Sequence, residues 1–182
     1  MAIGVINLLT IEANTYDELD KLKRFVNGRN GSFDFENIMP VPKGIKDKDD
    51  MYNIEKYSPR YLHNGEKYRG FAESDWRMDN WGVEENAQFV EISDDIEEKK
   101  KGTKSYYAIT YNFDTVNGTC YKVLKALSHK FKNLKFKWRY ASESYGKDTG
   151  SYLFKGDREV RKNYKEGSDK AILHSMWCWG EL

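Results

Sequence analysis

Cysteine, proline and long apolar runs are scarce in this chain of 182 residues, and each scarcity excludes a class of protein. The two cysteines, Cys120 and Cys178, are too few for a disulfide framework and lack the paired spacing of a zinc site. No apolar run approaches the roughly 18 residues that a membrane-spanning helix needs. The opening stretch MAIGVINLLTIEA lacks the basic leader and the cleavage-type end of a signal peptide. We therefore expect a cytoplasmic protein with reduced thiols and no membrane partner.

Catalytic motifs are missing as well. Neither G-x-x-x-x-G-K nor G-x-G-x-x-G occurs, so the chain has no glycine-rich phosphate loop. His63, His129 and His174 are far apart and stand in no metal-ligand spacing. Cys120 is the better candidate for a reactive thiol, because it stands near the start of an expected helix, although most cysteines at such positions are simply packed. The sequence favours a protein that is not an enzyme, with no metal and no cofactor.

Charge is distributed unevenly, although the net charge is only +1. Residues 73–98 hold ten acidic residues against Arg77 alone, whereas basic residues predominate from residue 99 onward. Aromatic residues make up 15% of the chain, and Tyr accounts for 13 of them. Such asymmetry can steer a charged partner, and Tyr or Trp rings can serve either a core or a contact surface.

The first half of the chain predicts a strand, a helix and an irregular insertion. Residues 2–13 are rich in Ile, Val and Leu and predict a central strand. Thr15 and Glu18 form a capping box that begins a helix, which Asn27 and Gly28 end. Residues 32–38 predict a short strand or extended segment that prolines stop, and residues 44–75 have no clean period. We expect an insertion at about 44–75, with one short helix after Ser58-Pro59.

In the second half of the chain, apolar and polar residues alternate more regularly. Residues 86–93 predict a strand with Ala87 and Phe89 on one face, and residues 94–102 a charged turn. Residues 105–114 predict the next strand and residues 119–131 a helix. Residues 134–140 and 151–154 predict two further strands, and the aromatic tail 171–182 is expected to dock on the body or pair with the sheet edge.

This order predicts an α+β fold of the ferredoxin-like kind, in which an antiparallel sheet carries two helices on one face. We expect a single domain over residues 1–182, with the insertion at about 44–75 and a C-terminal extension at about 156–182.

Four segments carry a family resemblance: NLLTIEA, FDFENIMPVPKGI, WRMDNWGVEENAQFVEIS and YNFDTVNGTCYKVLKALSHKFKNLKFKWRYASE. Together they resemble the YubB-like family of plasmid and phage proteins, which have a ferredoxin-like domain and no established enzymatic activity. The chain departs from the family where Trp-Gly is followed by Val83, Glu84 and Glu85 in place of Thr, Lys and Trp. It departs again where Gly118-Thr119 replaces a Pro-Pro helix entry.

Two surfaces remain as candidate sites. The acidic stretch is typical of a solvated face, but it also fits docking on a basic, nucleic-acid-handling protein, with rings as anchors and carboxylates for steering. Its candidate residues are Trp76, Trp81, Glu84, Glu85, Asp94, Asp95, Glu97 and Glu98. With the resemblance, this predicts a phage or mobile-element protein that inhibits a host defence machine, as anti-CRISPR proteins do, in the host cytoplasm. The alternative is an RNA- or DNA-binding module that uses Lys135, Lys137 and Arg139.

Overall fold

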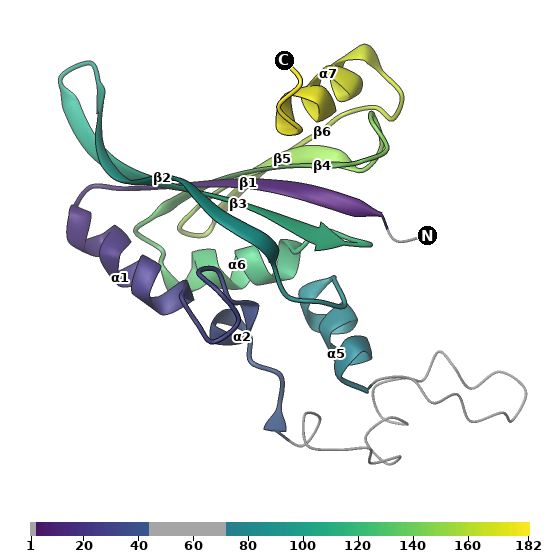
Figure 1. Cartoon of the computed structure of the whole chain (residues 1–182). Coiled ribbons are helices and arrows are strands. Elements are labelled where there is room, and N and C mark those ends of the chain that lie inside the picture. Colours follow the sequence, from purple (N-terminus) through teal and green to yellow (C-terminus); the bar gives the residue numbers. More distant parts are fainter. Residues whose placement is uncertain (1–2, 44–71) are drawn as a thin grey trace, which may run out of the picture.

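A computed structural model describes residues 3–43 and 72–182 of the chain (Figure 1). The helix expected after Ser58-Pro59 and most of the expected insertion lie outside the described residues. Helix α5 (Ala72–Trp81) begins within the expected bounds of that insertion. Its apolar residues are too few to give a helical period in the sequence.

The sheet has six strands, β1 (Gly4–Ala13), β2 (Gln88–Lys101), β3 (Lys104–Val116), β4 (Lys135–Ser142), β5 (Thr149–Lys155) and β6 (Arg158–Asn163). Their order is β2-β3-β1-β4-β5-β6, and every neighbouring pair is antiparallel. The predicted α+β class with an antiparallel sheet is confirmed. β1 lies near the middle, as expected for the most continuously apolar strand.

Helices α1 (Tyr16–Val26) and α6 (Tyr121–Lys130) cover one face of the sheet, together with α2 (Phe35–Ile38) and α5 (Figure 1). The Thr15 hydroxyl accepts a hydrogen bond from the Glu18 amide, so the helix start was predicted correctly. The strand expected at residues 32–38 is wrong. There the Asp34 carboxylate accepts from the Glu36 amide at 3.0 Å, and this cap begins α2 instead.

The core lies between the helices and the sheet, and its strands alternate as the sequence predicts. Leu9 and Ile11 of β1 and Phe136 and Trp138 of β4 are fully buried on the helix side. One buried polar side chain, Asn7, lies among them. Its amide nitrogen donates to Val5 O, Phe113 O and Thr115 Oγ1, and its Oδ1 accepts from Trp138 Nε1 at 3.0 Å. Asn7 thereby links β1, β3 and β4.

The β2-β3 hairpin is longer than predicted. Residues 94–102 are not a charged turn, because β2 continues to Lys101 and pairs there with Lys104. The chain turns at Gly102, whose φ of 63° suits glycine. The pairing of β1 with β3 stops at Tyr107, so the hairpin tip extends beyond the rest of the sheet (Figure 1). Charged residues can occupy this strand because it lies at an edge and faces water.

The tail docks on the body, as expected. Helix α7 (Asp169–Cys178) lies on the face opposite to α1 and α6 (Figure 1). Trp179 Nε1 donates to Ser142 O at 3.1 Å, and the Gly146 amide donates to Ser175 Oγ at 3.1 Å. Within the described ranges, none of the helices has the length and apolar character to cross a membrane.

Candidate partner-binding surface

The two rings expected to anchor a partner lie in the core. Trp81 is fully buried. Its ring packs edge-on against the ring of Phe35, with 5.6 Å between the ring centroids, and its indole N–H donates to Met39 O at 2.9 Å. Trp76 is 8% exposed and packs edge-on against Trp81. Gly82 follows with φ of 86°, where an added Cβ would lie 2.7 Å from Thr119 O. The Trp-Gly pair is therefore a packing corner, and the prediction that these rings face a partner is corrected.

The predicted carboxylates, by contrast, are exposed at one edge of the sheet. Glu84 and Glu85 lie between α5 and β2, and the four others lie on β2 itself: Asp94, Asp95, Glu97 and Glu98. We call these six residues the acidic edge. Two of them have ion-pair partners. Lys23 Nζ lies 2.7 Å from Asp95 and holds the pKa of that carboxyl below its ordinary value, and Lys99 Nζ lies 3.3 Å from Glu97.

The charge on this edge has a structural explanation. β2 is the outermost strand, and its pairing with β3 is interrupted by three register shifts. Charges and bulges on an edge strand keep it from pairing with other chains. The carboxylates alone therefore do not require a partner.

The edge position does not explain the exposed ring of Phe89. Its side chain is 83% exposed, and its φ is 49°, in the left-handed region. That backbone conformation costs a residue other than glycine about 1–2 kcal/mol. Strain of this kind persists only where the surroundings impose it, and it concentrates at functional sites. An exposed ring on strained backbone thus lies beside Glu84 and Glu85 in the chain.

The sequence predicts Phe89 on the same face of the strand as Ala87, which is wrong, because Ala87 is buried and Phe89 is exposed. The register shift between Gln88 and Glu91 inverts the alternation, so that Val90 and Ile92 pack against the core instead. A bulge leaves no signal in a period-2 pattern. The available hint was the β-branched pair Val90 and Ile92, which formed a competing inward set.

The basic strand lies on the face opposite to the core and is engaged within the chain. Lys135 Nζ lies 3.1 Å from Glu12, and Lys137 also pairs with Glu12. Burial opposes ionisation of Glu12, but the two ammonium groups prevail and lower its pKa. The Arg139 guanidinium lies 4.3 Å from the centre of the Trp177 ring. The sheet thus brings Lys135, Lys137 and Arg139 together but partly neutralises them.

The remaining candidates for a reactive or metal-binding side chain are Cys120 and the three histidines. Cys120 is fully buried, and desolvation raises the pKa of its thiol, opposite to the lowering expected at a helix start. His174 bonds Gly150 O at 3.1 Å, and His129 is exposed on α6. His63 lies outside the described residues. In residues 3–43 and 72–182, no three His, Cys, Asp or Glu side chains gather as a metal site.

Both thiols are expected to resist modification in the native protein. Cys178 is buried like Cys120, and burial raises its pKa to about 11. At pH 8 a thiol-specific disulfide reagent should label neither cysteine within minutes, and both should react once the chain is unfolded in guanidinium. Fast labelling of the native Cys120→Ser variant would contradict the buried position of Cys178.

Comparison with protein-family models, with curated proteins and with solved structures found no match. The site is therefore defined by its own geometry. Its elements are the exposed, strained Phe89 and the acidic edge on the outermost strand.

Proposed function

We propose that this protein is a non-enzymatic binding protein that docks on a basic partner surface through Phe89 and the acidic edge. The exposure of Phe89 carries the proposal, because the strand's edge position accounts for the carboxylates but not for the ring. Large aromatic side chains supply much of the binding energy at interfaces, while surrounding charges set the association rate and the choice of partner.

The kind of partner follows from charge and from the family resemblance. Carboxylates on an exposed edge complement the basic surfaces that bind nucleic acid. A mobile-element protein with such an edge would occupy the nucleic-acid or partner surface of a host defence complex, in the manner of an anti-CRISPR protein, in the host cytoplasm. The strand order β2-β3-β1-β4, with α1 and α6 on one face, supports a ferredoxin-like core to which β5, β6 and α7 are added.

A capture experiment tests the role of the acidic edge. The tagged protein is compared with a variant in which Glu84, Glu85, Asp94 and Glu98 become Gln or Asn, so that the ion-paired Asp95 and Glu97 keep their contacts. We expect the wild type to capture a nucleic-acid-handling complex from host lysate. The variant should lose most of that capture, and added salt should weaken the wild-type complex because exposed charges are screened.

The control variant removes the same number of exposed carboxylates elsewhere, at Asp17, Glu143, Asp157 and Asp169. It should capture as much as the wild type. Equal capture by the wild type and the acidic-edge variant would overturn the proposal, as would equal loss in the control, which would point to net charge alone.

The second candidate function is nucleic-acid binding by Lys135, Lys137 and Arg139. A specific observation favours keeping it: Arg139 and the exposed ring of Trp177 form one surface on the open face of the sheet. Exposed rings and cations together can hold single-stranded nucleic acid. Binding to random oligonucleotides that falls steeply with salt, and that Trp177→Ala weakens, would support this function over the first.

A further inference from the structure

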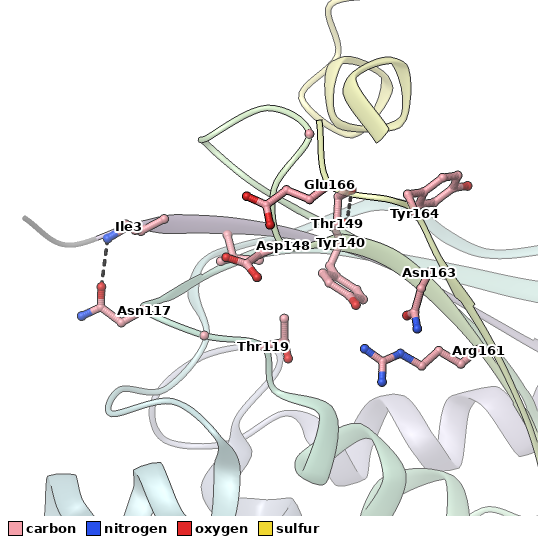
Figure 2. Close-up of a pocket in the computed structure, with 13 residues that line it drawn as sticks. Ile3, Asn117, Thr119, Tyr140, Asp148, Thr149, Arg161, Asn163, Tyr164 and Glu166 are labelled. Carbon is pink, nitrogen blue, oxygen red and sulfur yellow. Dashed lines mark hydrogen bonds between the residues drawn. The ribbon is translucent and has the colours of Figure 1, made fainter. Parts of the chain in front are cut away.

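A second site lies away from the acidic edge, at the end of the sheet where β4, β5 and β6 approach the start of α6 (Figure 2). The cavity has a volume of about 610 Å³, within the range of roughly 300–1,000 Å³ typical of small-molecule sites. Its polar lining residues come from the loop before α6, from β4, the turn after it and the start of β5, and from β6 and the segment that follows it.

The rim of the cavity is held by hydrogen bonds within the chain. The Ile3 amide donates to Asn117 Oδ1 and the Asn117 amide donates to Ile3 O, both at 2.9 Å. The Thr149 hydroxyl donates to Tyr140 O at 3.0 Å. Asn117 and Thr149 are thus engaged in the fold, whereas Thr119, Tyr140 and Arg161 are among the residues that line the cavity.

Arg161 makes one end of the cavity suited to an anion. Its guanidinium lies 5.4 Å from the centre of the Tyr152 ring, and among the described residues no carboxylate lies within ion-pair distance of it. Figure 2 shows Arg161, Tyr140 and Thr119 directed toward the same space. A guanidinium and two hydroxyls form a donor set that matches the oxygens of a phosphate.

Tyr140 is well placed to donate there. The residue is 6% exposed, and the centroid of its ring lies 4.7 Å from that of the Trp138 ring. Packing in the core therefore fixes the position of the phenol. Burial raises the pKa of Tyr140 although Arg161 acts in the opposite direction, so the phenol keeps its proton at neutral pH. A protonated hydroxyl can donate to an anionic oxygen.

The other side of the cavity is acidic. Asp148 reaches into the space across from Arg161 (Figure 2), and Glu166 lines the cavity near it. The Glu166 carboxylate lies 3.7 Å from Lys147 Nζ, and both side chains are largely exposed. Carboxylates at this side would repel a second phosphate but accept hydrogen bonds from hydroxyl groups.

We propose that this cavity binds a phosphorylated sugar, with the phosphate on Arg161, Tyr140 and Thr119 and the sugar hydroxyls on Asp148 and Glu166. The same chemistry is offered by a free sugar phosphate and by the sugar-phosphate part of a nucleotide. One cationic, anion-binding end and one acidic, hydrogen-bond-accepting end in a cavity of this volume fit that ligand better than they fit a bare anion.

Calorimetric titration of the full chain with ribose 5-phosphate, AMP, ribose and inorganic phosphate tests the proposal. Ribose 5-phosphate or AMP should bind at least tenfold more tightly than ribose or phosphate. Tighter binding of ribose 5-phosphate would identify a free sugar phosphate, and tighter binding of AMP a nucleotide. Arg161→Gln should weaken binding at least tenfold, and Tyr140→Phe should weaken it while keeping the ring.

The control is Arg158→Gln, because Arg158 lies on the same exposed strand but does not line this cavity. It should bind as the wild type does. Unfolding temperatures of all variants separate lost binding from lost folding. No heat with any probe at millimolar concentration would overturn the proposal, and so would equal binding of phosphate and ribose 5-phosphate.

Discussion

Replacing Asn7 with Ala is expected to lower the free energy of unfolding by about 3 kcal/mol or more, the largest loss for any single amide in the described core. The substitution removes a hydrogen-bond partner from Trp138 Nε1, Phe113 O and Thr115 Oγ1, although Thr115 still donates to Gly118 O. Asn7 is fully buried, so water does not replace these bonds. Each buried polar group left unpaired costs about 1–3 kcal/mol. Urea unfolding followed by tryptophan fluorescence measures the change.

The matched control is Thr10→Ala on the opposite face of the same strand. Thr10 bonds Thr110 through their hydroxyls at 3.1 Å and is only partly buried, so the expected loss is about 1 kcal/mol or less. A double-mutant cycle with Trp138→Phe should show coupling, because that substitution removes the indole N–H which Asn7→Ala leaves unpaired. Equal losses for Asn7→Ala and Thr10→Ala would contradict the role of Asn7 as the link between β1, β3 and β4.

Asn7 also shows where sequence reasoning succeeds and where it stops. The apolar alternation of β1 and β4 predicted both strands and the buried face of each, because burial on one face of a strand imposes a period of two. The same alternation cannot say that a polar residue within it is buried and bonded to three strands. That arrangement depends on Thr115 and Trp138, which are more than 100 residues away in the chain.

The candidate surface was predicted in part. The exposure of the six acidic side chains follows from their charge, since Asp and Glu are rarely fully buried. Trp76 and Trp81, the rings expected to anchor a partner, are buried, whereas Phe89, which was not among the expected anchors, is exposed. A tryptophan beside acidic residues in a sequence is equally consistent with an exposed contact surface and with a buried packing position. Only the packing of α5 against α2 and α6 decides between these two interpretations. The inversion at Phe89 depends on a register shift, which forms only when β2 pairs with β3.

The cavity beside Arg161 was not predicted at all. Its residues come from strand ends that meet at one end of the sheet and from the loop before α6, and none of them stands in a recognisable motif. Arg161 belongs to β6, a strand whose residues are all exposed and therefore carry no alternation. Such a site becomes visible only when β5 and β6 are placed beside β4.

Replacing Phe89 with Asn is expected to weaken partner binding strongly while leaving the protein as stable as before or more stable by about 1 kcal/mol. Asn adopts positive φ more readily than Phe does, so the substitution relieves backbone strain. The ring is 83% exposed and contributes little burial that could be lost. If it anchors a partner, its removal should weaken binding by about 2 kcal/mol, or roughly 30-fold. Affinity for the captured complex and urea unfolding measure the two effects.

A loss of binding affinity without a loss of stability distinguishes an interface residue from a core residue. A ring packed inside the protein would destabilise it by about 3–5 kcal/mol when truncated, and binding would fall only because folding fails. Val160→Asn is the matched control, since Val160 is 42% exposed on β6, the opposite edge of the sheet, and should change neither property strongly. Full binding by Phe89→Asn would leave the strain at this position without a functional reason. Lost binding together with retained or increased stability would mean that the protein keeps a strained, exposed ring because a partner needs it.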